Sequence, residues 1–260
     1  MKTPILAAIL ACAVLQPAIS AASPYEEDEE EQGHFPAPVY RYFGTQEAAE
    51  TAMHRDIKFA NEMGRHHQGA IDMSRAYLDD PRGTNPFLRQ MANAIILNQE
   101  FEIAWLEDLK RRVNAGPDSM IEIGGMGVVR LPAGLTGMEH KVRFQKAPVL
   151  SATEPISAQT PSDYDVMFAK AMTMHHQMGV DMAHDYNNDP AGGNKVIREI
   201  NIGIIRDQMV EIGFLSDFIV RYRGDPDAVQ IEPEMHKMMG MPHGNMPDGQ
   251  TPHSGMPDGS

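Results

Sequence analysis

Apolar side chains recur at alternating steps of four and three residues along residues 46–79, the spacing that places them on one face of an α-helix. The positions on this face are Phe59, Met63, His66, Ala70, Met73 and Tyr77. Similar periodicity, with capping residues at the starts and Gly, Asn or Pro at the ends, predicts further helices over about 85–114, 162–187 and 194–224. The pattern therefore predicts an all-α protein.

The first helix is repeated later in the chain. The segment Met63–Met73 returns without a gap as Met172–Met182, displaced by 109 residues (175 − 66 = 109). The same displacement relates polar residues of the second helix to polar residues of the fourth, namely Gln99 and Glu102 to Gln208 and Glu211. We therefore expect one four-helix bundle over 46–224, built from two duplicated helical hairpins at 46–114 and 162–224.

The remaining segments are expected to lie outside the bundle. Residues 115–161 are rich in Gly and Pro and lack helical periodicity, which indicates a long connection, with a short extended piece over residues 127–131. The acidic and Pro-rich leader, 23–45, and the polar tail, 225–260, have compositions typical of disordered segments.

The chain begins with a pattern typical of a secretory signal. Lys2 precedes an apolar run, and small residues near position 22 provide a cleavage site, so residues 1–22 are predicted to be removed on export to the periplasm. The single cysteine, Cys12, lies inside this run, and lipoprotein processing there is the less favoured alternative. Cleavage would leave no thiol, and no later stretch reaches the roughly 20 apolar residues of a membrane span.

Composition and charge favour a cationic ligand. The formal net charge is −14, which argues against a nucleic-acid partner because no basic stripe offsets it. The chain has 20 methionines against 12 leucines, although leucine is ordinarily among the commonest residues. Methionine at one helical position is more often flexible core filler than a ligand. The clustering of methionine with histidine makes a ligand role more favoured than it would be at one position alone.

A polar layer is predicted in the middle of the bundle. Gln99 and Glu102, and their counterparts in the fourth helix, interrupt otherwise apolar faces and would need buried partners, most simply the histidines. Because consecutive residues of a helix project about 100° apart, we expect His66 and His175 to face the interior. Their neighbours His67 and His176 are expected on the flank.

Each His–His pair has methionine three residues before and seven residues after its first histidine, which favours metal binding over a purely structural polar layer. Thioether sulfur favours Cu(I) and Ag(I), and imidazole accepts copper in either oxidation state as well as zinc. Small residues, Ala70 and Gly179, follow the first histidine by one turn and leave room for a ligand or for a close partner helix. Glu102 and Glu211 could hold the imidazoles by accepting the N–H that does not face the metal.

The tail carries a second set of soft ligands. They are Met235, His236, Met238, Met239, Met241 and His243. A disordered linker has no need of this methionine and histidine content, so we expect a flexible segment that collects metal ions.

The repeated pattern Met-x-x-His-His-Gln-x-x-[Ile/Val]-Asp-Met, followed by Gln-x-x-Glu, resembles the ferritin-like "domain of unknown function 305" family, to which CopM-type periplasmic copper-binding proteins belong. The resemblance covers both hairpins but neither the leader nor the connection. It implies a four-helix bundle that binds Cu(I), and also Ag(I), and aids copper resistance. The ligands that it implies are Met63, His66, His67, Met73, Met172, His175, His176 and Met182.

The sequence thus predicts an exported protein, not an enzyme, that sequesters or relays Cu(I). Its expected partners are the ion and a copper exporter or periplasmic copper chaperone. Two alternatives stay open. A ferritin-like di-metal oxidase is disfavoured because no Glu-x-x-His pair lies on the inner faces. A non-metal module would use the polar layer to set helix register and a methionine-rich surface to bind a partner protein.

Overall fold

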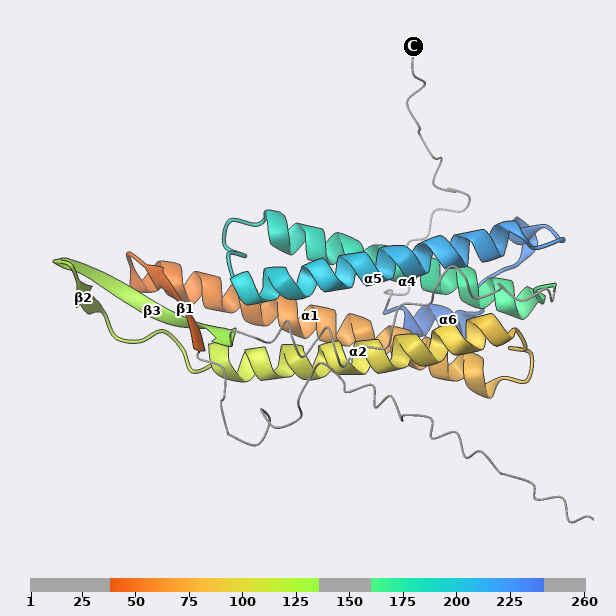
Figure 1. The fold of residues 1–260 in the computed structure, drawn as a ribbon, viewed down its shortest axis with the longest axis horizontal. Helices are drawn as coiled ribbons and strands as arrows, with labels where there is room; N and C mark the ends of the chain where they lie inside the picture. Colours follow the sequence, from red (N-terminus) through yellow and green to blue (C-terminus); the bar gives the residue numbers. More distant parts are fainter. Residues whose placement is uncertain (1–37, 136–159, 241–260) are drawn as a thin grey trace, which may run out of the picture. The chain divides into compact units, whose positions relative to one another are not determined.

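The computed structural model describes residues 38–135 and 160–240, and four long helices dominate these segments. They are α1 (Gln46–Asp79), α2 (Pro86–Val113), α4 (Asp163–Asn188) and α5 (Lys195–Val220). Helix α1 packs mainly against α2, and α4 packs mainly against α5, so each repeat forms one hairpin (Figure 1). The predicted all-α bundle of two duplicated hairpins is confirmed, with helix boundaries within a few residues of those expected.

Capping residues explain where the helices begin. The Oδ1 atom of Asn85 accepts hydrogen bonds from the backbone N–H groups of the first turn of α2, and Asn194 does the same for α5. Pro86 occupies the first helical position, where a missing N–H costs nothing. Ser162 and Asp165 form a capping box at the start of α4.

Helices α1 and α4 bring the two hairpins together in an antiparallel arrangement. Phe59 packs on Tyr186 with ring centroids 4.6 Å apart, and Tyr77 stacks on Phe168 at 4.2 Å. Residues early in α1 therefore meet residues late in α4, and the reverse. The duplicated hairpins are related by an approximate two-fold axis that passes between the middle of α1 and the middle of α4.

Two buried tyrosines link the hairpins on either side of this axis. The hydroxyl of Tyr77 donates a hydrogen bond to Asp165 Oδ1 at 2.6 Å, and the hydroxyl of Tyr186 donates one to Asp56 Oδ1 at 2.6 Å. Asn194 Nδ2 also donates to Asp56, at 2.7 Å. Burial raises the pKa of Asp56 above its usual value. Each aspartate therefore depends on donors from the opposite hairpin.

Two apolar cores lie on either side of the middle of the bundle. The first, which we call the sheet-end core, is formed by Phe59, Ala60, Met63, Trp105, Leu106, Leu109, Val113, Ala183, Tyr186, Val196, Ile197, Ile200 and Ile204. The second, the α6-end core, includes Ala70, Met73, Tyr77, Leu88, Met91, Ile95, Met167, Phe168, Met172, Leu215, Phe218, Met235 and Met239. The division follows from the stripe on α1, whose residues before His66 enter one core and whose residues after it enter the other.

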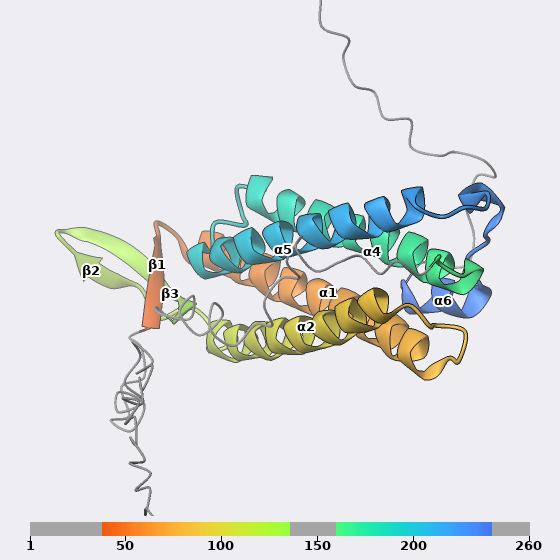
Figure 2. The ribbon, with the colours of Figure 1, turned by 45° about the vertical axis from the view of Figure 1, so that its right-hand side comes forward.

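A small sheet covers the first of these cores (Figure 2). Strands β1 (Pro38–Phe43), β2 (Ile121–Ile123) and β3 (Met126–Leu135) are antiparallel in the order β1-β3-β2. Strand β3 contains the extended piece expected in the connection. The prediction of a disordered leader was wrong for residues 38–43, because these residues pair with β3 and Arg41 forms an ion pair with buried Asp56 at 2.6 Å.

The beginning of the tail is also ordered, contrary to the prediction for 225–260. Residues Pro226–Ala228 form a 3₁₀ turn, η2, and Pro233–Met238 form a short helix, α6. Met235 and Met239 are buried in the α6-end core. The tail is too polar to fold alone, but its apolar side chains, chiefly these two thioethers, pack against a core that the bundle already provides.

Several predictions concern residues outside the described segments. They are the signal peptide at 1–22 with Cys12, the leader up to residue 37, most of the connection (136–159), and Met241 and His243 with the rest of the tail. In the described residues, every helix is too short or too polar to cross a membrane.

The buried tyrosine bonds generate a stability prediction. Replacing Tyr77 with Phe removes the shorter of two inter-hairpin hydrogen bonds to Asp165 Oδ1, the other coming from the backbone N–H of Asn85 at 3.4 Å, and we expect the free energy of unfolding to fall by about 1–3 kcal/mol. Urea unfolding followed by circular dichroism measures the change. Tyr42→Phe is the control, because that side chain is 57% exposed. Equal stability of the two variants would show that the buried hydroxyl does not link the hairpins energetically.

Candidate metal centre

The four predicted histidines lie together where α1 crosses α4. The ring of His66 stacks on the ring of His175, with centroids 3.8 Å apart and an interplanar angle of 29°. The stacked pair lies on the approximate two-fold axis, and of the two residues predicted to face the interior His175 is fully buried and His66 partly buried. Centroids of the adjacent rings, His67 and His176, lie 6.2 and 6.1 Å from those of His66 and His175. The structure thus gathers both repeats into one histidine layer, defined by these four residues.

The flank position predicted for His67 and His176 was wrong, since both side chains are fully buried. Nε2 of His67 lies 2.8 Å from Oε2 of Glu102, and Nε2 of His176 lies 2.8 Å from Oε2 of Glu211. Helix α1 has two neighbours, so a rotation of 100° turns one histidine toward the other hairpin and the next toward α2. Glutamate therefore meets the second histidine of each pair, rather than the first.

The histidine layer has unusually many buried polar atoms without an aligned hydrogen bond. Of sixteen such side-chain atoms among the described residues, eleven belong to it or border it: both ring nitrogens of His66, His67, His175 and His176, Gln99 Oε1, and both amide atoms of Gln208. The Nε2 atoms of His67 and His176 are close to carboxylates, but their N–H bonds are not directed at them. Buried polar groups normally have partners. Their concentration at one level marks this layer as the candidate ligand site.

Burial keeps the central imidazoles neutral. Desolvation, and then the neighbouring His67 and His176, lower the pKa of His66 to about 3. Desolvation also holds the pKa of His175 well below its usual value, with further lowering by the other three histidines. A neutral imidazole presents a nitrogen lone pair, which is the form that binds a metal ion. His66 and His175 therefore have nitrogen lone pairs that could bind a metal ion.

Room in the layer depends on a glycine. A methyl group at Gly179 would lie 2.5 Å from Gln208 Oε1 and 3.0 Å from His66 Cε1. Gly179 was predicted to leave space for a ligand or a close partner helix. In the structure this space is filled by the side-chain amide of Gln208 and the imidazole of His66. Gln208 and His66 meet at this point, although they come from different hairpins.

The predicted methionine ligands fall on both sides of the layer. Met63 is buried in the sheet-end core, and partly buried Met182 packs against the same core. Met73 and Met172 are buried in the α6-end core. Each core thus receives one methionine from each repeat, which is the distribution that the approximate two-fold axis imposes.

The methionines of the tail divide differently. Met235 and Met239 join the α6-end core, whereas His236 and Met238 are partly exposed on α6. Met91 and Met167 were not proposed as ligands but belong to that core as well. Their signal was weak, because methionine on an inward helical face is ordinarily packing. Six buried thioethers therefore lie on the α6 side of the histidine layer.

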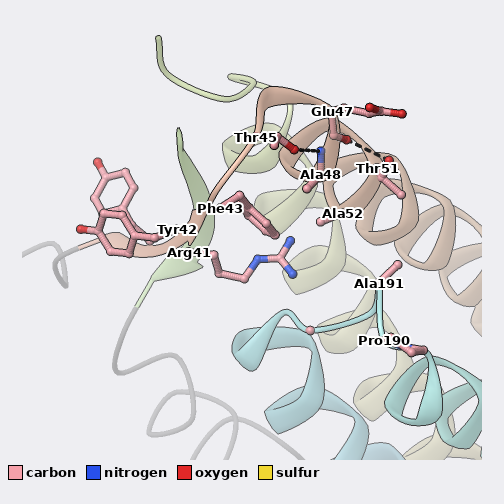
Figure 3. A pocket seen from close by; sticks show the side chains of 12 residues that line it. Arg41, Tyr42, Phe43, Thr45, Glu47, Ala48, Thr51, Ala52, Pro190 and Ala191 are labelled. Carbon is pink, nitrogen blue, oxygen red and sulfur yellow. Dashed lines mark hydrogen bonds between the residues drawn. The ribbon is translucent and has the colours of Figure 1, made fainter. Parts of the chain in front are cut away.

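Within the described residues, no group of three or more His, Cys, Asp or Glu side chains converges so as to hold one ion. A cavity of about 870 Å³ lies elsewhere, between β1, the start of α1 and the loop after α4 (Figure 3). Its lining includes Arg41, Phe43, Thr51 and Pro190, none of which is a predicted ligand. The candidate donors are thus the imidazoles of the layer together with the thioethers beside it.

The buried neutral histidines make stability depend on pH. The unfolded chain binds protons near pH 6.5 and folded His66 only near pH 3, so the unfolded state holds more protons between these values. Stability is therefore complete above pH 6.5. The free energy of unfolding should fall on acidification toward pH 3, by up to about 1.4 kcal/mol per pH unit for each of His66 and His175.

Comparing urea unfolding of the wild type and of His66→Gln/His175→Gln at pH 7.5 and pH 5 isolates this contribution from that of the carboxylates. The wild type should lose more stability between the two pH values than the double variant. If the wild type and the double variant lose equal stability between pH 7.5 and pH 5, the two imidazoles take up protons as readily in the folded protein as in the unfolded chain.

Comparisons with known proteins place this architecture in a family. Three stretches, 26–110, 56–219 and 165–254, match the model described as "Domain of unknown function (DUF305)". The first and third contain one copy of the histidine motif each, and the second spans both copies. Neither the curated proteins nor the solved structures gave a match. Since the longest stretch covers more than half of the chain, and both repeats match separately, the protein belongs to the DUF305 family.

Proposed function

We propose that this protein binds soft monovalent metal ions, Cu(I) foremost and also Ag(I), in and beside the histidine layer. The observation that supports this most directly is the concentration of buried imidazole nitrogens without an aligned hydrogen bond between two cores that contain buried thioethers. Unpaired buried polar groups cost stability. A bound cation would provide the interaction that they lack.

The donor chemistry selects the ion. Thioethers are poor ligands for hard cations, and neutral imidazole is a borderline donor, so the combination favours Cu(I) and Ag(I) over Mg²⁺ or Ca²⁺. Because no cluster of His, Cys, Asp or Glu in the described segments is complete by itself, an ion would need a methionine sulfur or a small movement of the rings. Met63, Met73, Met172 and Met182 are the nearest candidates along the two central helices, on the basis of sequence spacing and core membership.

The second histidine of each pair would be held by its glutamate. Glu102 and Glu211 each approach one imidazole Nε2 at 2.8 Å, so the opposite nitrogen, Nδ1, would be the one left to bind metal. Gln99 and Gln208 border the same layer and would orient the rings or accept their N–H groups. These four residues thus position the ligands without binding the ion.

We propose a role in sequestering or relaying copper outside the cytoplasm, without catalytic turnover. The net charge of −14 favours the approach of cations. The signal sequence would direct the chain to the periplasm, where no thiol would be left to compete with thioethers. A copper exporter or a periplasmic copper chaperone would be the natural partner for transfer, and binding would contribute to copper homeostasis and resistance.

Removing the stacked imidazoles tests the proposal. We expect His66→Gln/His175→Gln to weaken the tightest Cu(I) or Ag(I) site by at least about 100-fold, because two first ligands are lost and loss of an outer partner alone costs 10–100-fold. Competition with a chromophoric chelator under anaerobic conditions measures the affinity.

The matched control is His54→Gln/His184→Gln, which removes exposed histidines from the same two helices. Unchanged affinity in both double variants would instead support the polar layer as a structural device that sets helix register.

Methionine is tested by a change that keeps volume. Met63→Leu/Met172→Leu removes two buried sulfurs, one from each core, and should cost less than about 1.5 kcal/mol of stability. We nevertheless expect at least about tenfold weaker binding of Ag(I), since leucine cannot coordinate. Met53→Leu/Met209→Leu, at a peripheral and an exposed position, should bind like the wild type. If both variants bind equally, the buried methionines are packing residues.

A further inference from the structure

Helix α6 ends beside the histidine layer. A methyl group at Gly69 would lie well under 3.0 Å from the carbonyl oxygen of Met238 and 3.1 Å from Nε2 of His175. The backbone of α6 and one imidazole of the layer therefore flank the same glycine of α1. Figure 2 shows α6 lying across the ends of α1 and α4 that face away from the sheet.

This contact breaks the symmetry of the two repeats. The residue that corresponds to Gly69 in the second repeat is Met178 (69 + 109 = 178), whose side chain is partly buried against the α6-end core. The first repeat has no side chain at this position, and the backbone of Met238 occupies the space. The space beside Gly69 is thus filled by a segment from beyond the four-helix bundle.

Few interactions hold α6 in place. The helix has six residues, and its capping residue, Glu232, makes no side-chain capping hydrogen bond. Its buried anchors are Met235 and Met239, and Met238 packs partly buried against the same core. Its start is tethered by a hydrogen bond from the Glu232 N–H to Met167 Sδ at 3.4 Å and by an Arg82–Glu232 ion pair of which both members are about half exposed. Isolated helices of this length are unstable, and exposed ion pairs contribute little. Opening of α6 should therefore require much less free energy than unfolding of the bundle.

The segment before α6 is anchored more firmly. Lys170 Nζ donates hydrogen bonds to the carbonyl oxygens of Pro226 and Val229, at 2.7 and 2.8 Å. These bonds attach the η2 turn to α4, so α6 can leave the bundle while its connection to the chain stays in place. The arrangement is that of a hinge followed by a short, weakly held helix.

We propose that α6 is a lid over the His175 side of the histidine layer, and that soft metal ions reach the layer when α6 lifts from Gly69. This inference rests on the proposed function. The side chains that α6 turns to the bundle are thioethers, so the lid also offers soft ligands along the entrance.

A glycine substitution displaces the lid. Gly69→Ala places a methyl group against the Met238 carbonyl and 3.1 Å from His175 Nε2, whereas Gly64→Ala on the same helix meets nothing within 4 Å. Both changes raise helix propensity similarly, so Gly64→Ala is the matched control. Binding of Ag(I) is followed by stopped-flow fluorescence of Trp105, the single tryptophan, in the full-length mature protein. We expect Gly69→Ala to bind at least about tenfold faster than the wild type and the control, because closure of the lid limits the competent fraction.

Equal association rates in all three proteins, or slower binding by Gly69→Ala, would overturn the lid while leaving the proposed function intact. Failure of the wild type to bind Ag(I) would overturn both the lid and the proposed function.

Amide hydrogen exchange of the wild type provides a second measurement that needs no variant. The amides of His236, Met239 and Gly240, bonded within the lid segment, should exchange at least about 100-fold faster than those in the middle of α1. Comparable protection would show that α6 does not open.

Discussion

The antiparallel contact between α1 and α4 is the constraint on which the rest of the structure depends. It is fixed at both ends by a buried tyrosine hydroxyl that donates to an aspartate of the other hairpin, with Tyr77 bonded to Asp165 and Tyr186 to Asp56. Sliding of one helix along the other is opposed at both ends, because a shift of one turn would break both tyrosine–aspartate hydrogen bonds. The stacking of His66 on His175 follows from this fixed register.

The same register buries polar side chains between two apolar cores in the middle of the bundle. Imidazole nitrogens and amide groups without aligned partners destabilise the folded state, while the two apolar cores on either side stabilise it. A purely structural bundle would gain stability from apolar residues at these positions. Retention of four histidines at one level, in both repeats, is therefore the feature that a ligand-binding role accounts for best.

Duplication supplied two equivalent hairpins, and the segments outside them made the two ends different. The sheet-end core is covered by strands that begin in the leader and in the connection, and it contains the single tryptophan. The other core is covered by α6 and is lined with methionine. The histidine layer is therefore symmetric, but the two cores beside it differ. Most buried thioethers, and the weakly held helix α6, lie on the same side of the layer.

The sequence by itself determined the helices, their duplication and the buried stripe of α1, because these depend on local periodicity and on capping residues such as Asn85 and Asn194. It also placed His66 and His175 in the interior. It did not place His67 and His176, since a helix in a bundle packs against two neighbours and a single stripe describes only one of them. Strand β1 and helix α6 were missed because each is stabilised by residues far away in the chain, β3 for one and the methionine-lined core for the other. Local pattern decides which segments become helices, whereas the partners of a side chain, and the segments that fold only against a core formed elsewhere, are decided by tertiary packing.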